Sequence, residues 1–278
     1  MTRPMHPFHR TELLVGGEGF DRLTAARVAV IGLGGVGGHA AEALARSGVG
    51  SLTLVDFDKV CVTNVNRQIH ATRKTVGKLK SDLMADRVAQ INPKCCVTGI
   101  PTFFEEATKD ELLAPGFDVV IDCIDNMTAK VVLLETCVTR GIRVLSAMGA
   151  GGRMDPTRVR LGDLADTHTD PFARIVRDQM RQKGIATGIE VVWTDESPND
   201  LDAEAKAAFR CICPGKDENT KHSCERRFQV QGTVAWMPAV FGLTLAAAAV
   251  GHLIGAPLPH RSAPRPGRRS ARSADLAL

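Results

Sequence analysis

Apolar runs and helical patterns alternate along the first 150 residues of this chain. Five apolar runs have the length of buried strands: residues 28–31, 52–55, 97–100, 117–121 and 143–147. Three patterns of helical spacing lie between them: residues 39–47, 80–92 and 128–140. In the second of these, Leu83, Val88 and Ile91 are expected to face the sheet. Strands that alternate with helices predict βαβ units and a parallel sheet with helices on both faces.

The second half of the chain departs from this alternation. Residues 157–161 alternate as an edge strand does, and Asp170 followed by Pro171 is a typical helix start. Four apolar residues of that helix share one face: Phe172, Ile175, Val176 and Met180. We expect residues 193–202 to form a polar connection. The predicted fold is therefore α/β, with a doubly wound, mainly parallel sheet and an irregular or antiparallel C-terminal half.

Composition and charge divide the chain into a globular body and a tail. Apolar residues make up 44% of the 278, enough to bury one sizeable core. The net charge of +4 lies entirely after Ala256, where five arginines and one acid occur among prolines and serines. This composition predicts a disordered tail, residues 257–278, whose arginines either contact RNA phosphates or remain solvated.

Two further patterns concern the compartment. Eight cysteines occur without an N-terminal secretory signal, which predicts reduced thiols in the cytoplasm. Residues 234–254 are nearly all apolar and long enough to span a membrane. Pro238, Gly242 and His252 lie within this stretch, and we expect a buried helix rather than a membrane span.

A nucleotide-binding turn follows the first strand. Four glycines separate this strand from the next helix and let backbone N–H groups approach a phosphate: Gly32, Gly34, Gly35 and Gly37. The second strand ends at Asp56, a position suited to a ribose hydroxyl. The glycine spacing also fits G-x-G-x-x-G, so the turn alone is equally typical of an NAD-dependent oxidoreductase.

Arg67 and Lys80 favour an enzyme that cleaves a triphosphate, because cations at the phosphate end of a nucleotide stabilise developing charge and hydride transfer does not need them. With the glycine turn, four motifs resemble the adenylating domain of ubiquitin-activating enzymes and their bacterial relatives in thiamine and molybdopterin synthesis: Asp56-Phe57-Asp58, Asn66-Arg67-Gln68, Lys80 and residues 122–126. The resemblance covers about residues 8–255 and implies a Rossmann-like fold.

Three longer segments resemble tRNA threonylcarbamoyladenosine dehydratases within this superfamily: residues 61–71, 149–157 and 170–174. The resemblance implies ATP-dependent adenylation of the carboxylate of N6-threonylcarbamoyladenosine in tRNA, followed by cyclising dehydration. It also implies one adenylating domain over residues 1–256. That domain would comprise an N-terminal helix at 7–23, a nucleotide-binding half at 24–150 and a C-terminal half at 151–256.

The resemblance implies a role for each motif residue. The glycine turn would hold phosphate, Asp56 the ribose, and three side chains would line the triphosphate: Asn64, Arg67 and Lys80. Asp58 and Gln68 complete the expected ATP-binding set. Asp125 is expected to bind Mg²⁺, in preference to Asp122, because it belongs to the Asp-Asn motif of the family.

The same resemblance implies partners. The substrate would be a tRNA that decodes ANN codons, and the enzyme would be a homodimer in which Arg10 of one subunit reaches the nucleotide of the other. A cysteine desulfurase or sulfur acceptor remains an open partner. Four cations on the helix after Asp170 either contact tRNA or are solvated: Arg174, Arg177, Arg181 and Lys183.

Three alternative functions remain open from the sequence. One is an adenylyltransferase that activates the C-terminal glycine of a ubiquitin-like or sulfur-carrier protein, which needs a catalytic thiol and usually zinc. Cys224 would supply the thiol, but Cys211, Cys213 and Cys224 form an incomplete zinc set because no second cysteine pair follows. The others are an NAD-dependent oxidoreductase and a non-catalytic tRNA-binding protein.

Overall fold

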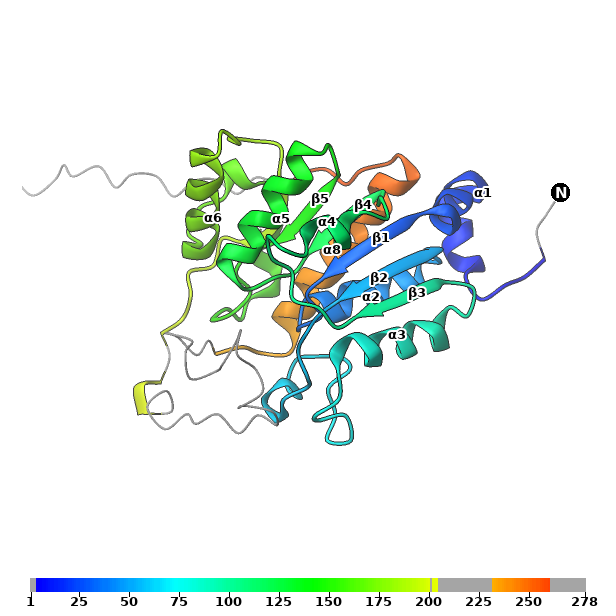
Figure 1. The fold of residues 1–278 in the computed structure, drawn as a ribbon, viewed down its shortest axis with the longest axis horizontal. Coiled ribbons are helices and arrows are strands. Elements are labelled where there is room, and N and C mark those ends of the chain that lie inside the picture. The colour runs from blue at the N-terminus through cyan, green and yellow to red at the C-terminus, as the bar shows by residue number, and fades with distance from the viewer. Residues whose placement is uncertain (1–3, 201, 205–231, 261–278) are drawn as a thin grey trace, which may run out of the picture.

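The computed structural model describes residues 4–200, 202–204 and 232–260 (Figure 1). The strands of these residues form one sheet in the order β3-β2-β1-β4-β5-β7-β6. They are β1 (Arg27–Ile31), β2 (Ser51–Val55), β3 (Cys96–Ile100), β4 (Val119–Asp122), β5 (Val144–Ala147), β6 (Val159–Asp163) and β7 (Glu190–Thr194). Neighbouring strands are parallel except β6, which runs antiparallel to β7 at one edge. The predicted fold class is confirmed.

Helices cover both faces of the sheet (Figure 1). They are α1 (His9–Ala25), α2 (Gly37–Arg46), α3 (Lys80–Ile91), α4 (Lys109–Leu113), α5 (Met127–Thr139), α6 (Pro171–Gln182) and α8 (Trp236–Ile254). One hydrophobic core lies on each face of the sheet. Alternate residues of β1 pack into these two cores, because successive side chains of a strand point to opposite faces. Val28 and Val30 pack with α2, α3 and α8, whereas Ala29 and Ile31 pack with α4, α5 and α6. Burial on both faces explains the continuous apolar runs.

The polar connection expected over residues 193–202 begins two residues later than predicted, because β7 extends to Thr194. Trp193 belongs to β7 and is 1% exposed. The strand sequence, residues 190–194, is rich in β-branched and aromatic residues, which is a strand signal. The expected edge strand exists as β6 but begins at Val159, and α2 begins two residues earlier than expected, at Gly37.

Two helix faces also differ from expectation. On α3, Met84 is fully buried, whereas Leu83 is only partly buried. On α6, Ile175 is 43% exposed and Ala173 is buried instead. In both helices, the line of buried residues is therefore rotated about the helix axis relative to the face expected from the sequence.

Helix α8 is long and apolar enough to cross a membrane, but half of its most apolar window is buried inside the protein. Phe241, Leu245 and Ala249 are fully buried in the core that α8 shares with α2 and the sheet. A Cβ added at Gly242 would lie 2.3 Å from the carbonyl oxygen of Val36, so this close approach requires glycine. These contacts support the expected buried helix.

Helix α1 lies beside the amino ends of the parallel strands. It is kinked at Gly16, where φ is 77°, and Phe20 after the kink is buried. A Cβ added at Gly48, three residues before β2, would lie 3.5 Å from Cγ of Phe8. The start of α1 therefore lies at the end of the sheet opposite to the glycine turn (Figure 1).

Candidate functional site

The candidate site lies at the carboxyl ends of β1, β2 and β4, the edge where open α/β sheets bind ligands. Strand β1 continues into Gly32, whose φ of 90° favours glycine and whose N–H donates to Val55 O at 2.8 Å. A Cβ added at Gly37 would lie 1.8 Å from Gly32 O. The turn therefore requires glycine at both positions and brings backbone N–H groups to the start of α2.

Asp56 fastens the glycine turn to β2. Its Oδ2 accepts a hydrogen bond from Leu33 N at 2.7 Å, and its Oδ1 accepts one from Asp58 N at 2.8 Å. Burial raises the pKa of Asp56, and the charge of Lys80 opposes that shift. The side chain thus shapes the turn, and the expected contact with ribose stays a prediction.

Lys80 is the buried cation of the site. It begins α3, is 5% exposed, and its Nζ lies 2.7 Å from Asp58 Oδ2 and 4.0 Å from Asp56 Oδ2. Burial lowers the pKa of Lys80, but Asp56 and Asp58 raise it by more, so the ammonium group stays charged. Asp125 raises the pKa in the same direction, so its carboxylate also acts on Lys80.

Asp122 and Asp125 have different surroundings. Asp122 is fully buried, and its Oδ2 accepts hydrogen bonds from Lys130 Nζ at 2.5 Å and Ser146 Oγ at 2.6 Å. Asp125 is exposed on the loop before α5. The next residue, Asn126, caps α5 by accepting a hydrogen bond from Ala129 N. These surroundings favour Asp125 as the carboxylate that faces a ligand.

The segment that carries Arg67 lies over the glycine turn. A Cβ added at Gly35 would lie 3.4 Å from Arg67 Cγ, and one at Gly34 would lie 3.9 Å from Gln68 Nε2. Arg67 Nη1 donates to Asn66 Oδ1 at 2.9 Å. Gln68 is 6% exposed, and its Oε1 has no hydrogen-bond partner among the described residues. A guanidinium and an amide group are thereby held next to the turn.

Asn64 is turned inward in this segment. It is 9% exposed, and its Oδ1 accepts a hydrogen bond from Cys61 N at 2.9 Å. It closes the 3₁₀-helix Val62–Asn64, whose geometry sets the direction of the chain toward Arg67. The expected contact between Asn64 and triphosphate stays a prediction.

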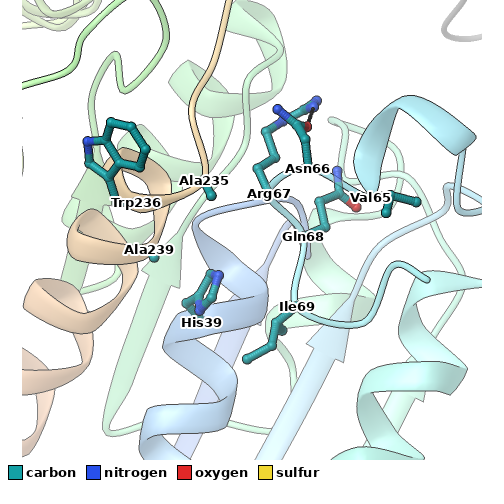
Figure 2. Close-up of a pocket in the computed structure, with 9 residues that line it drawn as sticks. All are labelled: His39, Val65, Asn66, Arg67, Gln68, Ile69, Ala235, Trp236 and Ala239. Atoms are coloured by element: carbon teal, nitrogen blue, oxygen red, sulfur yellow. Dashed lines mark hydrogen bonds between the residues drawn. The ribbon is translucent and has the colours of Figure 1, made fainter.

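An open hollow of about 370 Å³ lies between this segment, α2 and the start of α8 (Figure 2). Its lining residues are His39, Val65, Asn66, Arg67, Gln68, Ile69, Ala235, Trp236 and Ala239. Trp236 is 46% exposed, and its Nε1 donates to Met154 O at 2.8 Å, which holds the indole ring at the rim. The hollow therefore has an apolar wall beside the polar side chains of Arg67 and Gln68.

The three segments that carry the narrower resemblance are linked around this site. Asp170 accepts hydrogen bonds from Gly149 N at 2.9 Å and from Arg153 Nη2 at 3.0 Å, which joins residues 149–157 to the start of α6. Asn66 Nδ2 donates to Thr233 O at 2.9 Å, and Gly152 N donates to Gly232 O at 2.7 Å. Residues 232–233, just before α8, therefore link residues 61–71 to residues 149–157.

Several predicted residues lie apart from this cluster. Arg10 is exposed on α1. On α6, Arg177 donates to Thr167, and Lys183 pairs with Glu135 at 2.7 Å, so the cationic face is partly engaged within the chain. The predictions for Cys211, Cys213, Cys224 and the tail beyond residue 260 fall outside the described residues.

Sequence reasoning gave no role to three residues near the site. His39 and Trp236 line the hollow, and His70 is 5% exposed with neither ring nitrogen hydrogen-bonded among the described residues. A Cβ added at Gly38 would lie 3.3 Å from His70 Nδ1, so the ring packs on the start of α2. The signal for His70 was its place in the run Asn66-Arg67-Gln68-Ile69-His70; the contacts of His39 and Trp236 depend on the fold.

Comparison with known proteins identifies similar chains. The ThiF family matches residues 8–269. A protein of Bacillus subtilis named tRNA threonylcarbamoyladenosine dehydratase is 49% identical over 194 residues, which cover 70% of this chain and 76% of that protein. A molybdopterin-synthase adenylyltransferase of Salmonella typhimurium is 40% identical over 138 residues, 50% of this chain and 54% of that protein.

Crystal structures of Escherichia coli tRNA N6-threonylcarbamoyladenosine dehydratase are similar in fold. The structure in complex with ATP has a TM-score of 0.76 and 33% identity, and the match covers 90% of this chain and 94% of that chain. A structure of the same enzyme in complex with AMP has a TM-score of 0.77 with the same coverage. The similarity therefore extends over nearly the whole of that chain.

Proposed function

We propose that this chain, which belongs to the ThiF family, is an ATP-dependent tRNA threonylcarbamoyladenosine dehydratase. Its substrate would be the carboxylate of N6-threonylcarbamoyladenosine in tRNA, and its product the cyclised modified nucleoside, with AMP and pyrophosphate released. Relatives that carry this activity in their names match most of the chain, and one of them is described in complex with ATP.

The observation that carries the proposal is the convergence of the glycine turn, Lys80 and Asp125 at one edge of the parallel sheet. Gly32 follows β1, and the loop that contains Asp125 follows the adjacent strand β4. Lys80 is held between Asp56 and Asp58 after β2. Backbone N–H groups, one buried cation and one exposed carboxylate are the groups that a triphosphate requires.

The first step activates a poor electrophile. A carboxylate oxygen of the substrate attacks the α-phosphorus of ATP, the bond to the β-phosphate oxygen breaks, and pyrophosphate leaves with its electron pair. The product is a mixed anhydride of the substrate carboxyl group and AMP. Negative charge increases on the phosphate oxygens in this step, where Lys80, Arg67 and the N–H groups of the turn would stabilise it.

The second step closes a ring. The carbamoyl group of the same substrate attacks the activated carbonyl carbon, AMP leaves with the former carboxylate oxygen, and a proton is released. Because both reacting groups belong to one molecule, a held geometry supplies most of the acceleration and no protein nucleophile is required. Cys224 would then be dispensable for ring closure.

Asp125 fits a magnesium site by its donor chemistry. Mg²⁺ is commonly held by one or two carboxylates together with substrate phosphates, and Asp125 is an exposed carboxylate beside the Lys80 cluster. When bound there, the ion would offset phosphate charge. Asp122 does not fit, because it is buried, its Oδ2 accepts from Lys130 and Ser146, and its Oδ1 accepts from Ile124 N.

A homodimer with shared sites is part of the proposal. The start of α1, which carries Arg10, lies beside the amino ends of the strands, and five-residue strands, about 16 Å long, separate these ends from the glycine turn. An arginine side chain does not span that distance, so Arg10 would act on the partner's nucleotide. Leu13 and Leu14 on the same helix are 73% and 88% exposed, which suits burial between subunits.

The cysteines suit a reducing compartment. The cysteines of the described residues are free: Cys61, Cys95, Cys96, Cys123 and Cys137. Burial raises the pKa of Cys95 to about 11 and that of Cys137 to about 12, so these thiols stay protonated and unreactive. Cytoplasmic action on tRNA agrees with these free thiols.

The test is mass spectrometry of tRNA nucleosides after incubation of the full chain with ATP, Mg²⁺ and tRNA that carries threonylcarbamoyladenosine. We expect the modified nucleoside to lose the mass of one water, and to keep its mass when ATP is omitted. ATP–pyrophosphate exchange should depend on the modified tRNA. Exchange that depends instead on a carrier protein would support the adenylyltransferase alternative that the Salmonella typhimurium relative suggests.

A further inference from the structure

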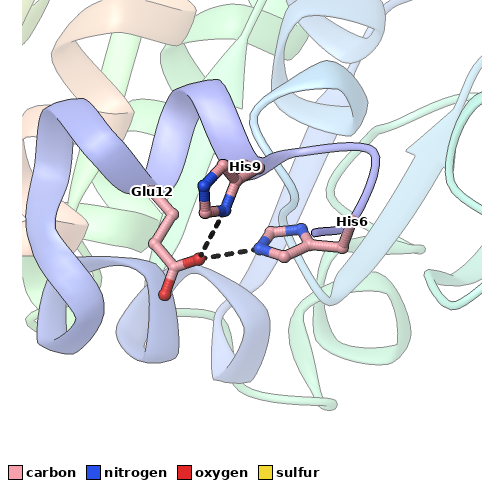
Figure 3. Close-up of side chains that lie close together, drawn as sticks. All are labelled: His6, His9 and Glu12. Atoms are coloured by element: carbon pink, nitrogen blue, oxygen red, sulfur yellow. Dashed lines mark hydrogen bonds and ion pairs between the residues drawn. The ribbon is translucent and has the colours of Figure 1, made fainter. Parts of the chain in front are cut away.

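Three metal-ligating side chains converge where the chain enters α1 (Figure 3). His6 lies just before the helix, whereas His9 and Glu12 share one face of its first turn at i and i+3 spacing. His6 Nε2 lies 2.8 Å from Glu12 Oε2, and His9 Nδ1 lies 3.6 Å from the same oxygen. The three ligand atoms all lie within 4.8 Å of one another.

We propose that His6, His9 and Glu12 form a binding site for a divalent transition-metal ion, with Zn²⁺ as the best fit. Two imidazole nitrogens and one carboxylate oxygen are ligands that Zn²⁺ accepts in a tetrahedral arrangement, with the fourth position left to solvent. Mg²⁺ and Ca²⁺ prefer oxygen ligands and fit this set less well. The site lies on α1, away from the glycine turn, and goes beyond the proposed activity.

The side chains are sheltered but still accessible to an ion. The Glu12 side chain is 12% exposed, and those of His6 and His9 are 24% and 33% exposed. His9 Nδ1 is buried and has no hydrogen-bond partner among the described residues, although its ring faces Glu12. A nitrogen that is buried without a partner carries an energetic cost, and a metal bond would remove that cost.

The required movement is small. Zinc with bonds of about 2.1 Å holds neighbouring ligand atoms about 3.4 Å apart, so the widest separation must close by at most about 1.4 Å. Partly exposed side chains make such shifts by rotation about their χ angles. The ring of His6 is steadied by Phe20, whose centroid lies 4.9 Å away, so His9 is the ligand expected to move most.

Binding requires a change of tautomer at His6. Phe8 N donates to His6 Nδ1 at 3.2 Å, so Nε2 carries the proton that faces Glu12. A metal at Nε2 would require this proton to move to Nδ1, which ends the hydrogen bond from Phe8 N. The ion would then take the place of the proton between His6 and Glu12, and His9 Nδ1 faces the same point.

The direct test is titration of the chelator-treated full chain with Zn²⁺ against a fluorescent zinc indicator. We expect Glu12→Gln and His9→Gln each to weaken one binding event at least tenfold, since changes even in outer-shell partners cost about 10–100-fold. Glu18→Gln is the matched control, because Glu18 lies on the same helix with its side chain 94% exposed. Equal affinity in all four proteins would overturn the proposal.

Two further readouts separate this site from thiols and from unfolding. The chain has eight cysteines, and accessible thiolates also bind Zn²⁺, so Co²⁺ is titrated in parallel. The binding event that is lost in Glu12→Gln should lack thiolate charge-transfer absorption. Zn²⁺ should also slow hydrogen exchange at the backbone N–H groups of residues 8–12 in the unmodified chain. Absence of that protection at saturating Zn²⁺ would overturn the site whether or not the variants fold, and neither readout depends on adenylation.

Discussion

The ammonium group of Lys130 lies 2.5 Å from Oδ2 of Asp122, and neither side chain is exposed to solvent. Lys130 also donates to Ser146 Oγ and to Ala147 O, each at 3.1 Å, so its three donors are all used. This network joins β4, β5 and α5 directly below the candidate site. It assigns Asp122 to the framework of the sheet and leaves Asp125, three residues later, as the candidate metal ligand.

Breaking this pair should destabilise the fold strongly. Lys130→Met would leave the Asp122 carboxylate buried without its cation, and we expect the free energy of unfolding in urea to fall by about 3–5 kcal/mol. Lys183→Met is the matched control, because Lys183 pairs with Glu135 where both side chains are more than one-third exposed, and should cost at most about 1 kcal/mol. A loss below about 1 kcal/mol for Lys130→Met would contradict the framework role.

Asp125→Asn should remove activity without loss of stability. Its side chain is exposed, so the substitution leaves the core intact and removes one negative charge. We expect ATP–pyrophosphate exchange, measured with modified tRNA, to fall by about 10²–10³-fold. Asp86→Asn is the control, since Asp86 is exposed on the solvent face of α3. Exchange at the unmodified rate in Asp125→Asn would exclude this residue from the mechanism.

Lys80→Met should lose both activity and stability. Lys80 is 5% exposed, and its Nζ lies 2.7 Å from Asp58 Oδ2, so its replacement affects the fold as well as the site. Without it, two neighbouring carboxylates lose their common cation, and we expect about 3–5 kcal/mol of destabilisation in urea. Lys94→Met, at an exposed loop position, should change neither quantity. A Lys80→Met protein of unchanged stability would show that its charge is not needed for folding.

His70 should make stability depend on pH below neutrality. Burial, followed by the charges of Lys80, His39 and Arg87, lowers the pKa of His70 from 6.5 to about 3. Between these values the unfolded chain binds a proton that the folded chain excludes, so stability is complete above about pH 6.5 and falls as the pH decreases toward 3. The slope for one proton is about 1.4 kcal/mol per pH unit.

The measurement is urea unfolding of the unmodified chain and of His70→Gln between pH 4.5 and 7. Glutamine does not titrate, so the free energy of unfolding of the variant should depend less steeply on pH than that of the unmodified chain. The difference should be at most the slope for about one proton. Identical slopes for His70→Gln and the unmodified chain would mean that His70 takes up its proton in the folded state.

The first half of the fold was predictable because its signals are local. Strands buried on both faces appear as continuous apolar runs, and the glycine turn requires glycine for steric reasons that sequence spacing records. Strand β7 was missed although residues 190–194 carry the β-branched and aromatic signal of a strand; only its pairing with β5 and β6, which lie far from it in sequence, depends on the fold. The displaced stripes at Met84 and Ala173 reflect how the helices rotate on the sheet, which periodicity alone does not fix.

The motifs named the residues of the candidate site but not the contacts among them. The motifs named Lys80 and Asp56, yet their ion pair, and the burial of both, depend on the packing of α3 against β2. Likewise, Asp170 was read as a helix cap, which it is, but its bonds to Gly149 and Arg153 cross from another segment. Contacts between distant segments leave no periodic trace in the sequence.

The position of Arg10 predicts that subunits complement each other. In the proposed dimer, Arg10→Ala would remove a cation from the partner's site, whereas Asp125→Asn would damage the subunit's own site. Each variant alone should be nearly inactive. In a mixed dimer, one of the two sites combines an intact Asp125 with the other subunit's intact Arg10. Subunit exchange should therefore restore up to about half of the activity per mixed dimer, if the two sites are independent.

The control for this experiment is a chain that carries both substitutions. Mixed with Arg10→Ala, it supplies no intact Arg10, so no site is complete and activity should stay at the level of the single variants. Light scattering at the working concentration must show a dimer, and a tagged subunit must confirm exchange. If exchange is complete and the Arg10→Ala and Asp125→Asn mixture stays inactive, Arg10 does not act across the interface. Because α1 begins beside the amino ends of the strands, Arg10 would then have no route to either nucleotide site.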